Sequence, residues 1–398
     1  MAATAPVAPN PTVLVWARRE SGYAPVQVAK RLGVKEDRLA EWEMGDRVPT
    51  LRQLEGLAKM YHRPLGVFFR PKPPVVAALA TEYRRLPGLS PGEESPELRL
   101  AVRKMSNRRE TMIDLLDEVG DLVPTFTLAA HLHEEPAAVA TRLRAALGVP
   151  VKTQLGWNNE WQAWSAWREA VEELGVLVFQ FPGIPLEEIR GISLLHWPLP
   201  VAGVNSKEAS PEARSFTLIH EVVHLMLAAG KEEQPAAKEP RRGSAWQAVE
   251  RFAEETASHT LVPEPALRSL VATANMRTED WDIAAVRKLA RRFRITPLAM
   301  ATRLRSSGFM GWDHYREWKN DWTAHLATLK PRSGGFATPV TKTLGRAGRP
   351  FTKLVLEAMS GNRITSDQAA RHLDLKFDHF DKLRDALRAG PGTGGGNE

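Results

Sequence analysis

The sequence predicts a mainly α-helical protein that also contains a small antiparallel β-sheet. Apolar residues recur at the three- and four-residue spacing of amphipathic helices over four stretches, namely residues 11–70, 97–147, 279–328 and 349–389. Three short apolar runs have the length and composition of strands instead: residues 175–181, 189–195 and 200–205. Together these patterns predict an N-terminal helix-turn-helix bundle, a central α+β domain that holds the sheet, and C-terminal helical modules.

Length, charge and cysteine content limit the class of protein. The 398 residues are enough for several domains, and the formal net charge of +7 favours an anionic partner such as nucleic acid. The chain has no cysteine, so it has no disulfide framework, which fits a reducing compartment. No apolar run reaches the ~18 residues of a membrane helix, and the first residues lack the pattern of a secretory signal. We therefore expect a cytoplasmic protein with no membrane contact.

Residues 11–70 are predicted to form a compact helix-turn-helix unit. Gly33 lies in the segment Arg31–Lys35, where a tight turn joins two helices. The segment Glu43–Thr50 resembles the Glu-x-Gly-x-x-x-Pro-Ser/Thr signature of XRE (Cro/repressor-like) domains, and this resemblance implies DNA binding. The residues that we expect to contact DNA are basic: Lys35, Arg38, Arg18 and Arg19.

The helix that would read the DNA also carries acidic side chains, which repel phosphate. It begins at Lys35 and continues with Glu36 and Asp37, and Pro25 occupies a position where the family usually has Gln. Two interpretations therefore remain open. The unit binds DNA, or it is an interaction or dimerisation module.

The strongest chemical signal is the segment His220–His224, which reads His-Glu-Val-Val-His. It lies inside an apolar run, Phe216–Leu227, that neither Pro nor Gly interrupts, so we predict a buried helix. Two histidines four residues apart share one face of a helix and can bind one metal ion, while Glu221 is free to act on water. The alternative is a pair of histidines that only satisfy hydrogen bonds, but such groups are costly on an apolar helix unless paired or metal-bound.

A zinc site of the catalytic kind normally has three protein ligands, and cysteine cannot supply the third one here. The next helical stretch, residues 249–263, offers Glu250 and Glu254, which lie four residues apart on one face. We predict Glu250 as the third ligand and Glu254 as a carboxylate that orients a histidine ring. His259 is nine residues from Glu250 and points to another side of the helix, so we do not expect it to bind the metal. The alternative for both carboxylates is a solvated acidic face.

Residues 155–270 resemble the ImmA/IrrE-type metallopeptidases. The zinc helix of that family reads Phe-Thr-x-x-His-Glu-x-x-His, which matches Phe216–His224, and its upstream strand ends in Val-Asn, as Val204-Asn205 does here. Downstream, Glu250 and the segment Leu261–Pro263 stand at the offsets found in the family, whereas position 254 has Glu in place of the usual Asn.

This resemblance implies a zincin-like α+β peptidase domain whose cofactor is Zn²⁺. The implied zinc ligands are His220, His224 and Glu250, and Glu221 is the implied catalytic base that takes a proton from the attacking water. The domain organisation that we predict has five parts: an XRE-like domain at 11–70, a helical connecting region at 78–150, the peptidase domain at 155–275, a helical region at 279–330 and a C-terminal helical module at 335–390.

The function expected from these features is a zinc-dependent endopeptidase coupled to a repressor-like domain. By resemblance, its substrate is a regulatory protein such as a repressor or a toxin partner, in a bacterial stress, mobile-element or toxin–antitoxin circuit. Further partners considered are DNA and a second copy of the chain. The alternative is a DNA-binding regulator or antitoxin with a non-catalytic zinc site, although the presence of Glu221 beside the histidines favours catalysis.

Overall fold

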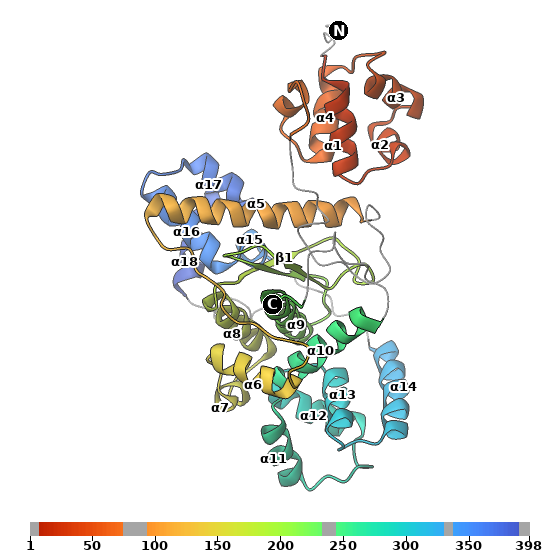
Figure 1. The fold of residues 1–398 in the computed structure, drawn as a ribbon, viewed down its shortest axis with the longest axis vertical. Coiled ribbons are helices and arrows are strands. Elements are labelled where there is room, and N and C mark those ends of the chain that lie inside the picture. The colour runs from red at the N-terminus through yellow and green to blue at the C-terminus, as the bar shows by residue number, and fades with distance from the viewer. Residues whose placement is uncertain (1–7, 75–93, 233–243, 330–336, 390–398) are drawn as a thin grey trace. The chain divides into compact units, whose positions relative to one another are not determined.

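A computed structural model describes residues 8–74, 94–232, 244–329 and 337–389 (Figure 1). The chain divides into two compact units, residues 1–104 and 105–398. The segments of the predicted 78–150 and 335–390 regions that fall between the described ranges are outside this description. Among the described residues, no helix has the length and apolar character needed to cross a membrane.

The first unit contains a small bundle of short helices, as predicted for residues 11–70. Gly33 ends one helix in the left-handed conformation, with φ of 67°, which positions the next helix across the turn. Thr50 and Gln53 form a capping box at the start of the last α-helix. Trp42, Tyr61 and Phe68 are almost completely buried in its core. The elements are α1 (Pro11–Glu20), α2 (Pro25–Leu32), α3 (Glu36–Met44), α4 (Leu51–Tyr61) and the 3₁₀ helix η1 (Leu65–Phe69).

The second unit is built from many helices around one small sheet. The long helix α5 (Pro96–Val119) contributes residues to both units. The helices that come before and after the strands in the chain are α6 (Pro136–Ala146), α7 (Val151–Leu155), α8 (Glu160–Glu173), α9 (Pro211–Ala229) and α10 (Ser244–Leu261). Those that follow are α11 (Glu264–Ala274), α12 (Ile283–Phe293), α13 (Pro297–Ser306), α14 (Trp312–Thr328), α15 (Pro339–Ala347), α16 (Arg349–Ser360), α17 (Ser366–Leu373), η3 (Phe377–His379) and α18 (Phe380–Arg388).

The sheet has three strands in the order β1-β3-β2, and it lies at the positions that the sequence predicts. The strands are β1 (Leu177–Phe181), β2 (Gly191–Leu194) and β3 (Val201–Asn205). The prediction of a purely antiparallel sheet was wrong, because β3 pairs in parallel with β1 and antiparallel with β2. Successive strands do run in opposite directions. β3 lies between β1 and β2 in the sheet. Because it reverses the direction of β2, which itself reverses that of β1, it runs parallel to β1.

The core of the second unit surrounds α9. This helix packs against α8, α10, β2 and β3, and its apolar residues from Leu218 to Leu227 are completely buried. From α8, Trp164 and Trp167 bury their rings in the same core. The Arg168 guanidinium donates to backbone carbonyls of β1 and α15, at Val178 and Gly345, and so ties the C-terminal helices to the sheet. This packing makes α9 a rigid platform for any chemistry that it carries.

Candidate metal centre

The helix α9 holds both predicted histidines in a fixed orientation. Ser210 caps its first turn by accepting a hydrogen bond from the backbone of Ala213, and Pro211 occupies the first helical position. The side chain of His224 is completely buried, and that of His220 is 13 % exposed. Because the helix is packed on several sides, the two imidazoles have little freedom to move relative to each other.

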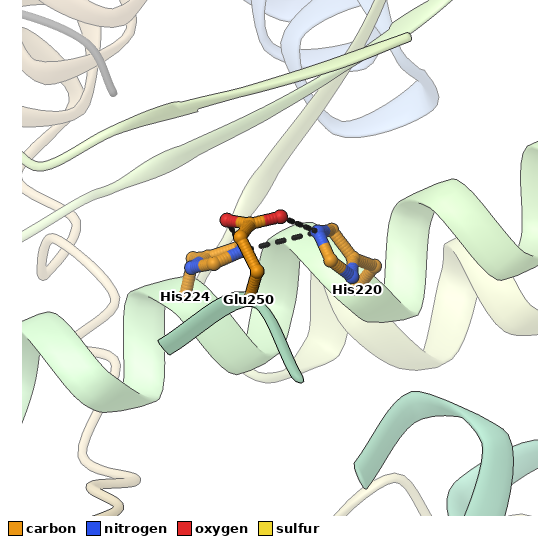
Figure 2. Close-up of side chains that lie close together, drawn as sticks. All are labelled: His220, His224 and Glu250. Atoms are coloured by element: carbon orange, nitrogen blue, oxygen red, sulfur yellow. Dashed lines mark hydrogen bonds and ion pairs between the residues drawn. The ribbon is translucent and has the colours of Figure 1, made fainter. Parts of the chain in front are cut away.

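The helix α10 brings Glu250 to the histidine pair. It packs against α9 and α6 through buried residues such as Phe252, Ala253 and Ala257. Glu250 lies on the side of α10 that meets α9, and Figure 2 shows its carboxylate facing both imidazole rings. The carboxylate is 20 % exposed, so the site is open to solvent on one side. In this way the structure brings together the three residues that the sequence predicts as ligands.

The three side chains form a compact donor set. The Nε2 atoms of His220 and His224 are 3.0 Å apart. The Glu250 carboxylate places Oε2 at 3.7 Å from Nε2 of His220 and Oε1 at 3.5 Å from Nε2 of His224. One ligand atom from each residue falls within 4.8 Å of the other two. Among the described residues, this is the one group of His, Asp and Glu side chains with that property.

These distances fit a zinc ion. Tetrahedral zinc binds nitrogen and oxygen at about 2.0–2.2 Å, which places neighbouring ligand atoms roughly 3.3–3.5 Å apart. The observed separations of 3.0, 3.5 and 3.7 Å surround that range. Two imidazoles and one carboxylate are also a ligand set that catalytic zinc sites use, with a fourth position left for water. His220, His224 and Glu250 would therefore hold the ion if it binds here.

The carboxylate of Glu221 faces the strand β2. Ser193 in β2 donates a hydrogen bond from its hydroxyl to Oε2 of Glu221 at 2.5 Å, and both side chains are buried. Gly191, two residues earlier, leaves the space that this carboxylate occupies. A Cβ atom at that position would lie 2.4 Å from Oε1 of Glu221. The strand thus orients the Glu221 carboxylate through the Ser193 hydrogen bond, and the absence of a side chain at Gly191 gives the carboxylate room.

Ser193 was not predicted from the sequence as a site residue. Its only signal is a hydroxyl within the apolar run Ile189–Leu195, and this signal does not reveal which distant residue it contacts. Arg190 in the same run forms an ion pair with the buried carboxylate of Glu208 at 3.1 Å.

Removal of the Ser193 hydroxyl is expected to slow catalysis without releasing zinc. A hydrogen bond to a charged group contributes about 1.5–3 kcal/mol, so Ser193→Ala is expected to lower kcat about 10- to 100-fold if Glu221 is the base. Ser193→Thr, which keeps the hydroxyl, is the matched control and should be less affected. Steady-state kinetics with parallel measurement of zinc content test this. Equal activity of Ser193→Ala and the wild type would show that the hydrogen bond has no role in catalysis.

Two other residues near the site differ in their surroundings. Glu254 lies one turn after Glu250, but its side chain is exposed and it is not part of the donor set. Its role in orienting a histidine therefore stays a prediction.

His259 lies further along α10 and receives a hydrogen bond at its Nδ1 from Arg303, at 2.9 Å. Burial, with a further contribution from Arg303, lowers the pKa of His259 to about 4, so the ring is neutral at pH 7. It does not join the metal site.

The basic residues predicted to contact DNA are in different environments within the first unit. Arg18 donates two hydrogen bonds to Glu43, at 2.7 and 2.9 Å, and is 11 % exposed. Its guanidinium is used inside the unit. Lys35, Arg38 and Arg19 are exposed, but Arg38 forms an ion pair with Glu41 at 3.1 Å.

Comparison with protein families gives two matches. Residues 171–305 match the family model of the IrrE N-terminal-like domain, Peptidase_M78, which spans the sheet, α9 and α10. Residues 14–68 match the helix-turn-helix family model, which spans α1 to α4. The two matches confirm the resemblances that the sequence motifs indicate. A search of curated proteins gave no significant match.

Proposed function

We propose that this chain is a zinc-dependent endopeptidase coupled to a repressor-like domain, and that it cleaves a regulatory protein. The observation that carries the proposal is the donor set of His220, His224 and Glu250, which lies beside the buried carboxylate of Glu221 on α9. The match to the Peptidase_M78 family supports a metallopeptidase-like domain in the same residues.

The residues of the chain have separate roles in this proposal. A zinc ion held by His220, His224 and Glu250 would supply a Lewis acid that lowers the pKa of water and polarises a peptide carbonyl. Glu221 accepts the proton of the attacking water and then delivers it to the nitrogen of the leaving amine. Ser193 donates a hydrogen bond to one oxygen of that carboxylate at 2.5 Å and so holds its orientation, while the other oxygen lies against Gly191.

The strand β2 is the element that we propose to bind the substrate backbone. In the described part of the chain, β2 is at the edge of the sheet and pairs only with β3. It also carries Gly191 and Ser193, the two residues that contact Glu221. An extended peptide that adds to this edge would form backbone hydrogen bonds there and pass close to the proposed base.

We propose a repressor or a toxin partner, in a bacterial stress, mobile-element or toxin–antitoxin circuit, as the class of substrate. The helix-turn-helix match supports a regulatory setting, and DNA is the partner that it suggests for the first unit. The exposed basic residues Lys35, Arg38 and Arg19 are the contacts that we propose for it.

Comparison of new protein N-termini in cells that express the wild type or Glu221→Gln tests the endopeptidase function. The proposal expects one or a few cleaved regulatory proteins that are present with the wild type and missing with the variant. Identical sets of termini in the two strains, with zinc bound in both proteins, would favour the regulator with a non-catalytic zinc site.

A further inference from the structure

Several helices of the described chain end in the same left-handed backbone turn, among them those that end near His62, Gly308 and Asn362. Three further examples are at Gly33, Arg294 and Asp374, with φ of 67°, 54° and 50°, and they precede α3, α13 and the segment η3–α18. In each case the backbone N–H of the next residue returns to the carbonyl of the alanine four residues before the turn residue. These bonds are Val34 to Ala29 at 3.0 Å, Ile295 to Ala290 at 3.2 Å and Leu375 to Ala370 at 3.1 Å.

The first and last of these turns also correspond in sequence without a gap. Residues 24–42 align with residues 365–383, and the identical pairs are Gln27 and Gln368, Ala29 and Ala370, Leu32 and Leu373, Lys35 and Lys376, and Asp37 and Asp378. The two glutamines have the same role, since each accepts a hydrogen bond from the backbone N–H three residues earlier, at 2.9 and 2.7 Å. In these features residues 365–388 resemble the helix-turn-helix of the first unit.

Burial supports the same correspondence. Leu39 and Trp42, which fix the second helix of the first unit, are each 2 % exposed. Their counterparts Phe380 and Leu383 are 1 % and 0 % exposed. The second helix of each pair is thus anchored through the same two positions, and its remaining faces are available to solvent.

The middle turn, between α12 and α13, is enclosed by its neighbours. Arg303, at the position that corresponds to Trp42 and Leu383, is 2 % exposed and pairs with Glu264 at 2.9 Å. The guanidinium of the turn residue Arg294 donates to the backbone carbonyl of Trp157, which precedes α8. These contacts give the turn between α12 and α13 a structural role, so we do not include it with the two turns at Gly33 and Asp374.

The C-terminal helix-turn-helix carries a charge distribution suited to phosphate. The described residues 337–389 contain ten Lys and Arg against six Asp and Glu. Four of its carboxylates form ion pairs with arginines of the same module, in the pairs Asp367–Arg371 at 2.9 Å, Asp381–Arg384 at 2.9 Å, Asp374–Arg346 at 3.6 Å and Asp385–Arg388 at 3.7 Å. Lys376 and Lys382 are exposed, and within the described residues neither has an ion pair.

The second helix of the first unit is more acidic than its C-terminal counterpart. Arg38 and Arg47 both pair with Glu41, at 3.1 and 3.5 Å, whereas Glu36 and Asp37 are exposed at the start of α3. At the corresponding positions the C-terminal copy has Phe377 in place of Glu36 and Lys382 in place of Glu41, while Asp378 matches Asp37 and Asp381 replaces Ala40. A phosphate backbone that approaches the second helix therefore meets less negative charge in the C-terminal copy.

We infer that residues 365–388 are a second DNA-binding element, in which Lys376 and Lys382 contact the phosphates of duplex DNA. Helix-turn-helix units place their second helix against the duplex, with the start of that helix nearest to the base pairs. Lys376 immediately precedes the second helical segment, and Lys382 lies within it. Because phosphate contacts carry no base information, the inference concerns affinity for duplex DNA and not a particular sequence.

Binding of the full-length chain to a random-sequence DNA duplex of about three helical turns tests this inference. The variant is Lys376→Ala with Lys382→Ala. The matched control is Lys342→Ala with Lys353→Ala, which removes the same charge from exposed positions of the same module. Fluorescence anisotropy is recorded over a range of salt concentrations, and circular dichroism confirms that all proteins are folded.

The inference expects the Lys376/Lys382 variant to bind about tenfold more weakly at low salt. It also expects the slope of log K against log salt to become shallower by about 1.8, because each phosphate contact contributes ~0.9. The control pair should change both values much less. Equal losses of affinity in the two double variants would show that only the total positive charge of the module matters, and this would overturn the inference. Loss of binding on Arg38→Ala, with no effect of Lys376 and Lys382, would also overturn it and assign DNA binding to the first unit.

Discussion

Replacement of Glu221 by Gln is expected to lower kcat/KM for the cleaved protein by at least about 10³-fold. A positioned general base contributes roughly 10²–10⁴-fold to such reactions, and an amide cannot accept the proton of the attacking water. Gln has almost the same shape as Glu, and its amide oxygen can accept the hydrogen bond from Ser193 that the carboxylate accepts at 2.5 Å. The variant should therefore keep both its fold and its bound zinc.

The measurement is the rate of substrate cleavage, with zinc content and thermal unfolding recorded on the same samples. Glu212→Gln changes the same kind of side chain in the first turn of α9 and serves as the matched control. It should cleave at the rate of the wild type. If Glu221→Gln cleaved at that rate too, then Glu221 would not be the base.

Replacement of Glu250 by Ala is expected to lower the affinity for zinc by about 100-fold or more. Loss of one ligand leaves two imidazoles, and a carboxylate that only orients a ligand typically contributes 10- to 100-fold. Glu250 stands at 3.5 and 3.7 Å from the Nε2 atoms of His224 and His220, and Glu254 is not part of this donor set. Zinc binding also stabilises the folded state, so the melting temperature at micromolar zinc should fall.

Competition with a chelator of known zinc affinity gives the dissociation constant. Glu254→Ala is the matched control because it removes the same group from the same helix, one turn away and exposed. A small loss of affinity in this control would support the predicted orienting role of Glu254. A loss as large as that of Glu250→Ala would contradict the choice of Glu250 as the third ligand.

The local part of the site could be predicted from the sequence. His220 and His224 share a face because residues four apart on a helix always do, and the apolar run around them made the helix evident. The first unit was predictable for the same reason, since Gly33 and the residues after Glu43 form a signature over a short stretch. Glu250 lies on another helix, and it was predicted from its spacing and from the resemblance to a family.

The contacts that depend on distant parts of the chain could not be predicted. The contact of Ser193 with Glu221 depends on how β2 lies against α9, which no local pattern in either segment specifies. The parallel pairing of β1 with β3 was missed because short apolar runs do not reveal the order of strands in a sheet.

The repeated helix-turn-helix at residues 365–388 was not recognised from the sequence. It shares only scattered identities with residues 24–42, and its turn residue is Asp374 in place of Gly33. Asp374 tolerates the left-handed conformation better than most residues other than Gly. The buried pairs Leu39 and Trp42, and Phe380 and Leu383, make the correspondence visible.

The central claim is that one zinc ion binds to His220, His224 and Glu250, and X-ray absorption at the zinc edge of the purified full-length chain tests it most directly. The account predicts about one zinc ion per chain, with two imidazole nitrogens and carboxylate or water oxygens at about 2.0–2.2 Å. A chain that takes up no zinc, or a zinc spectrum without imidazole scattering, would contradict it.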